Sequence, residues 1–176
     1  AAIAAFAQHH GALTPVLDWT KSIYVAAFFA FAGFPLRPFC DAKQSGNVVL
    51  WGLRPSAFDR AATLNPNQFS FRVVPATMPY NRRLIAQQGV FTFVKPVQDL
   101  ITLAQRQSDR DSTTYLYRVA IPASEVRHAQ THLNRMNINY ATLYPDYVGA
   151  CKHAELVVRN EEYEGGDSNP RANLLG

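Results

Sequence analysis

The order of hydrophobic and polar residues along the chain predicts five β-strands. Short runs of branched and aromatic residues, some of them alternating with polar residues, are typical of strands buried on one or both faces. They occur at residues 16–20, 47–53, 69–74, 89–94 and 114–121. Pro122 directly follows the last run, and proline cannot donate a hydrogen bond to a neighbouring strand, so we expect that strand to end there.

Helical segments are predicted between these strands. Residues 22–31 are apolar on almost every side of a helix, which is typical of a helix in the middle of a domain, and a hydroxyl of Thr20 or Ser22 can cap its start. An amphipathic helix is predicted with Ser124 as its cap, and a final helix begins at the Pro-Asp pair that ends in Asp146. Shorter helical segments are predicted at residues 1–8, 55–63, 81–86 and 97–106, and a polar loop at residues 108–113.

The arrangement of these segments predicts the fold class. Strands that are mostly separated by helices, without a strict β-α-β order, indicate a single α+β domain with mixed or antiparallel sheets around the buried apolar helix. We expect the domain to span residues 1–158 and a flexible tail to follow at residues 159–176, which are acidic and then rich in glycine and asparagine. The chain begins with Ala1 in what resembles the end of a helix, so we also expect part of the domain to precede it.

Composition narrows the possible functions. With 176 residues, of which 48% are hydrophobic and 17% charged, the chain can form one globular core. The net charge of +4 favours a phosphate-bearing partner, but the basic residues are spread along the chain and give little support for nucleic-acid binding. The longest apolar stretch, residues 23–34, is about half as long as a membrane span, so no membrane association is expected.

The cysteine content indicates the compartment. Cys40 and Cys151 are too few for a disulfide framework and have no metal-binding spacing. A reducing compartment, and therefore the cytoplasm, is the expected location, although pairing of the two cysteines stays open.

The first stretch with candidate chemistry is the corner between the first strand and the apolar helix. Asp18 lies at the end of a strand that we expect to be buried, where an ionised carboxylate is costly unless donors surround it. It either accepts hydrogen bonds from the backbone of the turn, or it holds a ligand hydroxyl or orients a catalytic group. Trp19 either packs in the core or offers a flat face beside the helix start, where Thr20 and Ser22 accompany backbone donors suited to phosphate.

The second stretch precedes the fourth strand. Arg82, Arg83, Gln87 and Gln88 come just before Gly89 and an aromatic strand. Amide side chains there can bond ribose or amide groups, and the arginines can pair with phosphate. The alternative is an ordinary solvated turn.

Two histidines near the start of the chain are a weaker signal. His9 and His10 are adjacent, so they point in different directions on a helix, and at most one of them can reach the pocket of Asp18. His9 either caps a helix end before Gly11 or orients a ligand and carries a proton. No metal is expected, because no pair or cluster of histidine and cysteine has a ligand spacing.

Three stretches together resemble the FRG domain, a family named after an upstream Phe/Tyr-Arg-Gly motif. The family pattern Q-H-Y-G-x-P-T-R-L-L-D-W-T-x-S, followed by an apolar A-x-x-F-A helix, is similar to residues 8–22 and 26–30. The pattern R-I-x-A-Q-x-G-x-F-T is similar to residues 83–92, and T-L-F-P-D-x-x-G to residues 142–149. Pro15 replaces the usual arginine, and no Arg-Gly pair occurs in the chain, so we expect the naming motif to precede Ala1.

This resemblance implies a function. The order of motifs resembles that of ADP-ribosyltransferases, which implies an ADP-ribosyltransferase-like fold that binds NAD and transfers ADP-ribose to a protein, to nucleic acid or to water. In those enzymes the third motif carries a glutamate where this chain has Gln87 or Gln88. A bacterial or phage conflict system, with the domain as a toxin or a phage-defence component, is the setting that the resemblance suggests.

The roles of individual residues follow from the same resemblance. Gln87 would hold the ribose, His9 would orient a ribose or carry a proton, and Asp18 would supply negative charge near the oxocarbenium-like state. The residues expected to bind the dinucleotide are Thr14, Trp19, Thr20, Ser22, Arg83 and Gln88. Two other hypotheses stay open: a nucleotide-binding or interaction module that has lost turnover, and a nucleic-acid-binding domain. The missing Arg-Gly pair, Pro15 and the absent glutamate favour the first of these two.

Overall fold

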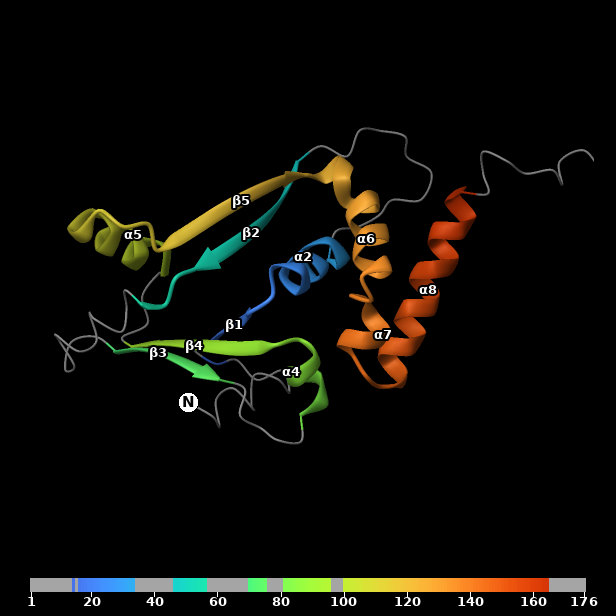
Figure 1. The fold of residues 1–176 in the computed structure, drawn as a ribbon, viewed down its shortest axis with the longest axis horizontal. Helices are drawn as coiled ribbons and strands as arrows, with labels where there is room; N and C mark the ends of the chain where they lie inside the picture. The colour runs from blue at the N-terminus through green and yellow to red at the C-terminus, as the bar shows by residue number, and fades with distance from the viewer. Residues whose placement is uncertain are drawn as a thin grey trace, which may run out of the picture.

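Two separate antiparallel sheets form the framework of the protein (Figure 1). The computed structural model describes residues 14, 16–33, 46–56, 70–75, 81–95 and 100–164. Within these residues, the first sheet has the strand order β1-β4-β3 and the second pairs β2 with β5. The strands are β1 (Val16–Thr20), β2 (Asn47–Leu53), β3 (Ser70–Pro75), β4 (Gly89–Lys95) and β5 (Leu116–Pro122). All five predicted strands are therefore present.

Helices surround and separate the sheets. The helices in the described residues are α2 (Ile23–Ala32), α4 (Arg82–Ala86), α5 (Leu100–Asp111), α6 (Val126–Arg135), α7 (Tyr140–Leu143) and α8 (Tyr147–Glu164), with a 3-10 turn η1 (Ala123–Glu125) before α6. Figure 1 shows α2 between the sheets, α6, α7 and α8 at one end of the molecule and α5 at the other. The α+β class predicted from the sequence is confirmed, and both sheets are antiparallel.

Helix α2 is apolar on nearly every side because one of its faces packs in the core and another lines a cavity. Ser22 caps its start, with Oγ accepting a hydrogen bond from the Val25 N–H. Val25, Phe28 and Phe31 form a buried face, whereas Ala26, Phe29 and Ala30 line a cavity described below. The helix is central, but Ile23 and Tyr24 at its start are exposed.

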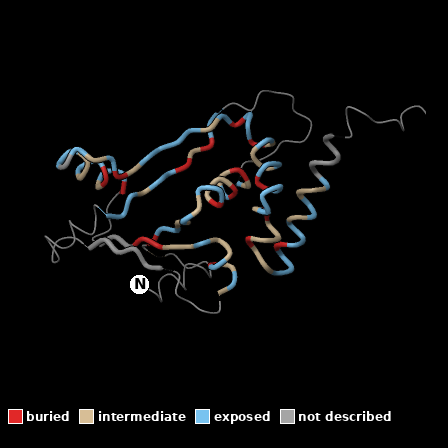
Figure 2. Tube along the Cα trace, in the orientation of Figure 1, coloured by how far each residue is buried: buried red, intermediate tan, exposed pale blue. Residues whose placement is uncertain are grey.

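Most of the buried apolar residues that the structure describes belong to two clusters (Figure 2). The larger cluster packs the buried face of α2 against β2, α6 and α7, with Val48, Val126, Leu133 and Leu143 as its other buried members. The smaller cluster joins α5 to the start of β5 through Leu100, Ala104 and Tyr115, and Trp19 packs against it. The apolar face of β1 is thereby tied to a helix about eighty residues later in the chain.

Two local predictions are wrong. Residues 108–111 continue helix α5 instead of forming a loop, because the segment holds no glycine or proline and the Ser108 hydroxyl donates to the Ala104 carbonyl at 2.8 Å. Ser124 does not cap α6, since it lies inside the 3-10 turn that Pro122 introduces, and α6 begins without a side-chain cap.

The last helix extends into the segment that we predicted as a tail. Helix α8 runs to Glu164, beyond residue 158, where we expected the tail to begin. The helical segment predicted at residues 1–8, His9, and most of the segment at 55–63 lie outside the described residues.

Candidate functional site

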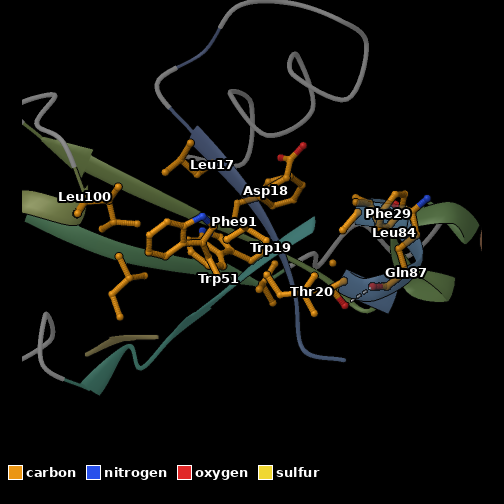
Figure 3. A pocket seen from close by; sticks show the side chains of 18 of the residues that line it. Leu17, Asp18, Trp19, Thr20, Phe29, Trp51, Leu84, Gln87, Phe91 and Leu100 are labelled. Carbon is orange, nitrogen blue, oxygen red and sulfur yellow. Dashed lines mark hydrogen bonds between the residues drawn. The ribbon is translucent and has the colours of Figure 1, made fainter. Parts of the chain in front are cut away.

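A cavity of about 880 Å³ is lined by residues of both sheets, α2 and the end of α4 (Figure 3). This volume lies within the range of about 300–1,000 Å³ that is usual for sites of small molecules and cofactors. The strands β1 and β2 are edge strands of different sheets and do not pair with each other. Residues of both strands line the cavity, which therefore lies between the two sheets.

The pairing of β1 with β4 brings together the two stretches that the sequence singled out. In this antiparallel pair Thr20 lies opposite Gly89, and the register continues to Val16 opposite Phe93. The turn that leads into β4 therefore lies beside the turn that leads out of β1. Of the nine residues predicted for the site, the cavity is lined by Asp18, Trp19, Thr20 and Gln87.

Hydrogen bonds lock these two turns together. The Thr20 hydroxyl donates to the Gln87 carbonyl at 2.8 Å and accepts from the Ser22 N–H at 3.1 Å. The Lys21 N–H donates to the Gln88 carbonyl at 3.1 Å. The only hydroxyl proton of Thr20 is thus used in a hydrogen bond within the protein. A ligand can still donate a hydrogen bond to the second lone pair of this oxygen.

Both tryptophans of the chain line the cavity. The indole Nε1 of Trp19 donates to Thr92 Oγ1 at 2.9 Å, and Thr92 is only 3% exposed, so the Trp19 ring is held in one orientation. Trp51 on β2 is 41% exposed. In Figure 3 both indoles lie between Leu100 and Thr20, where they offer flat faces to a planar group.

Asp18 lies at the rim of the cavity. Side chains alternate along a strand, so Asp18 and Trp19 belong to opposite faces of β1, and in Figure 3 the carboxylate points away from the indole. The expectation that Asp18 lies in a buried strand is wrong: β1 is an edge strand, and Asp18 is exposed. Hydration removes most of the cost of its charge, and Asp18 also takes part in a further interaction.

Gln87 ends helix α4 and faces the cavity with a fixed amide. Asn81 caps the start of this helix through the Leu84 N–H, and Gln87 is its C-cap. The Gln87 Nε2 donates to the Leu143 carbonyl at 3.1 Å. No hydrogen bond joins Gln87 Oε1 to any of the described residues, so this oxygen is the atom that can accept a donor from a ligand.

The other predicted residues lie away from the lining. Arg83 is ion-paired with Asp146, with Nη2 2.7 Å from Oδ2, instead of extending into the cavity. Ser22 is occupied as the cap of α2, and Gln88 is exposed, with a positive φ of 48° that ends α4. Thr14 is half-buried outside the lining, and His9 lies outside the described residues.

An aromatic and charged corner closes the Gln87 end of the cavity. The guanidinium of Arg83 lies 4.7 Å from the centre of the Tyr144 ring, and Tyr144 lines the cavity. Phe29 meets the same ring edge to face at 6.2 Å. Burial, followed by the neighbouring Tyr140, raises the pKa of Tyr144, and burial also raises the pKa of Tyr140, so both rings are neutral at physiological pH.

The lining determines what the cavity can hold. None of the described lining residues is a cation, Asp18 is their one acid, and most of the others are aliphatic or aromatic. The described residues contain no group of three histidine, cysteine or acidic side chains able to hold a metal ion. Across the same residues, we find no helix with the length and apolar character that a membrane span requires.

The fold and the cavity first define a class: an α+β domain with an aromatic, ligand-sized cavity between two antiparallel sheets. The family model of the FRG domain matches residues 1–34, which confirms for this stretch the resemblance inferred from the sequence. The matched stretch includes β1 and α2 and therefore supplies one wall of the cavity. Comparison with curated proteins and comparison with solved structures give no match.

Among the lining residues that were not predicted for the site are three aromatic ones, Phe29, Trp51 and Tyr144. Trp51 lies in a segment predicted as a strand, Phe29 in the predicted apolar helix and Tyr144 in the stretch 142–149 that resembles the family pattern. The useful signal for Trp51 was its rarity, since the chain has only two tryptophans and the other was already a candidate. Nothing local distinguishes Phe29 from the buried phenylalanines beside it.

Proposed function

We propose that the cavity binds NAD and that the domain is an ADP-ribosyltransferase-like enzyme. The observation that carries this proposal is the convergence of Asp18, Trp19 and Thr20 with Gln87 around one cavity of suitable size. The family match to residues 1–34 supports it, because these residues include the first of the three stretches on which the resemblance rests.

The lining suits the nicotinamide half of NAD. The nicotinamide ring is flat and positively charged, and aromatic faces attract such cations. Trp19 and Trp51 would stack with the ring, and the Gln87 oxygen would accept a hydrogen bond from a ribose hydroxyl. None of the described lining residues is basic, so the proposal assigns these residues to the nicotinamide half and not to the pyrophosphate.

The transfer itself would break the bond between the ribose and the nicotinamide nitrogen. The electron pair of that bond leaves with nicotinamide, and the sugar carbon develops positive charge before an acceptor oxygen or nitrogen attacks it and releases a proton. Asp18 at the rim would stabilise that charge. The acceptor would be a protein, a nucleic acid or water.

A second candidate is a nucleotide-binding module without turnover. Three polar side chains expected to act on the ligand are instead used by the framework: Thr20 holds Gln87, Ser22 caps α2 and Arg83 pairs with Asp146. Gln87 is also neutral and stabilises positive charge less than a glutamate would. These contacts favour binding over catalysis.

Incubation of the full-length protein with NAD separates the two candidates. For the enzyme we expect nicotinamide release that falls at least about tenfold in Asp18→Asn and in Gln87→Ala, which corresponds to about 1.4 kcal/mol in the barrier. For the binding module we expect an NAD-dependent rise in unfolding temperature without release. If NAD changes neither quantity, the proposal is wrong, and salt-sensitive nucleic-acid binding becomes the function to test.

A further inference from the structure

The corner between α7 and α8 is joined to the helix that carries Gln87. Asp146 caps α8, with Oδ1 accepting from the Gly149 N–H at 2.9 Å, while Oδ2 accepts from Arg83 at 2.7 Å. One carboxylate therefore fixes the start of α8 and also holds helix α4 in place.

A second contact joins the same two parts of the chain. Arg83 and Gln87 lie on successive turns of α4, since the Gln87 N–H donates to the Arg83 carbonyl at 3.0 Å. The Gln87 side chain reaches Leu143 at the end of α7, and Arg83 reaches Asp146 just beyond it. Two bonds spaced one helical turn apart leave α4 little freedom to rotate against α7.

The partner of Gln87 also determines which of its amide atoms faces the cavity. The Leu143 carbonyl can only accept a hydrogen bond, so the amide nitrogen must turn toward it and the amide oxygen away from it. A glutamate at this position would place an acceptor against an acceptor, because an ionised carboxylate has no proton to donate.

We propose that Leu143 and Asp146 form a positioning device for Gln87, which makes position 87 a specific acceptor for a ligand hydroxyl or amide N–H. Asp146 is a positioning residue that acts through Arg83 without touching the ligand. The inference rests on the proposed function in taking NAD as the ligand, whose ribose hydroxyls and carboxamide supply such donors. The hydrogen bond to Leu143 explains why position 87 holds an amide, where the resemblance leads one to expect an acid.

Intrinsic fluorescence offers a direct binding assay, because both tryptophans line the cavity. The full-length protein is titrated with NAD, and we expect the dissociation constant to rise about fivefold to tenfold in Gln87→Ala, the loss of about one hydrogen bond. We expect at least as large a rise in Gln87→Glu. A Gln87→Glu protein that binds NAD as tightly as the wild type would overturn the proposal.

Two substitutions away from the cavity control for changes of charge. Gln105→Glu makes the same change on the exposed side of α5, and Arg135→Ala removes an exposed cation from the last turn of α6 that has no ion pair among the described residues. Both should bind NAD like the wild type. We expect Asp146→Asn to weaken binding about threefold to tenfold.

A double-mutant cycle distinguishes positioning from a general loss of stability. If Asp146 acts through Gln87, then Asp146→Asn should change the affinity for NAD little when Gln87 is already alanine. If the two effects on affinity are instead additive, Asp146 acts by another route and its assignment as a positioning residue is wrong.

Proton exchange tests the inference without a ligand. The Gln87 side-chain amide, observed by ¹⁵N NMR, should exchange with solvent more slowly than that of Gln105, and Asp146→Asn should remove the difference. If NAD leaves the fluorescence of the wild type unchanged while this exchange behaves as expected, the proposed ligand is wrong and the positioning device is not. Equal exchange at Gln87 and Gln105 in the wild type would contradict the device itself.

Discussion

At the scale of single residues, most polar side chains near the cavity hold the framework together. Thr20 joins the two turns at the mouth of the β1–β4 pair, Trp19 is tied to a buried threonine, and Arg83 is paired with an acid. Each of these groups was a candidate for direct ligand contact. Because these side chains are already hydrogen-bonded or ion-paired within the protein, Gln87 Oε1 is the clearest acceptor for a ligand. The indole rings are the main apolar surface.

Replacement of Thr20 tests this distribution of roles. Thr20→Val keeps the shape but leaves the Gln87 carbonyl and the Ser22 N–H without their partner, so we expect a loss of about 1–3 kcal/mol in the free energy of unfolding. Thr20→Ser retains the hydroxyl and should lose less. Urea denaturation followed by circular dichroism measures both, and equal losses in the two variants would show that the hydroxyl is unimportant.

Gly149 is required by close packing at the start of α8. A Cβ there would lie 2.7 Å from the Tyr140 carbonyl oxygen and still closer to that of Tyr144, so backbone would have to move. We expect Gly149→Ala to reduce the free energy of unfolding by about 1–3 kcal/mol or more. Gly33→Ala is the matched control, since its Cβ would meet its nearest atom at 3.5 Å and its φ of −78° suits alanine. Similar unfolding temperatures for both variants would contradict this packing.

At the scale of elements, short helices are placed by their caps and by the polar contacts at their ends. Helix α4 has five residues and α7 four, too few to be stable by themselves. Asn139 and Thr142 form a capping box on α7, Asn81 caps α4, and the Arg83–Asp146 pair joins the two helices. The wall of the cavity formed by these helices therefore depends on polar contacts as well as on burial.

The Asp146 contacts predict a specific response to acid. The hydrogen bond from Gly149, and then that from Arg83, lower the pKa of Asp146 from its ordinary value of 3.8. The unfolded chain therefore takes up this proton more readily than the folded protein, so the stabilisation is complete above the ordinary pKa. It is lost as the pH falls through that value and then through the folded pKa.

Unfolding temperatures between about pH 6 and about pH 2.5 measure this effect. Asp146→Asn should unfold at a lower temperature than the wild type at the upper pH, and the difference should shrink toward the lower pH. A difference that stays constant over the whole range would mean that the ionisation of Asp146 does not contribute.

At the scale of the whole molecule, helix α2 connects the core to the cavity. Phe28 is 5% exposed and packs edge to face against Tyr140 at 4.9 Å, while Phe29 on the neighbouring face lines the cavity and meets Tyr144. Loss of the core on one side of α2 should therefore disturb the cavity on the other.

Phe28→Ala tests whether the molecule unfolds as one unit. We expect it to reduce the free energy of unfolding by about 3–5 kcal/mol, since it leaves a void in the larger cluster. Circular dichroism reports the helices, and fluorescence reports the cavity through the two tryptophans, so both should show the same lowered midpoint. If the fluorescence midpoint stays at the wild-type value, the cavity region unfolds independently of α2.

Much of the fold could be predicted from the sequence because it depends on local interactions. The strand at residues 47–53 and the cap at Ser22 follow from side-chain alternation and from hydrogen bonds within four residues. The errors at Ser108 and Ser124 have a local origin too: serine suits both a loop and a helix, and the sequence alone does not show which hydrogen bond it makes.

The sequence by itself determined the class of fold, the five strands and two of the stretches that line the cavity, because periodicity and capping act between near neighbours. Only the tertiary structure decided which side chains remain available to a ligand. The side-chain hydrogen bonds of Thr20, Arg83 and Gln87 join residues that are 67, 63 and 56 positions apart in the sequence. Contacts over such separations depend on how the sheets and helices pack, and no local pattern records that packing.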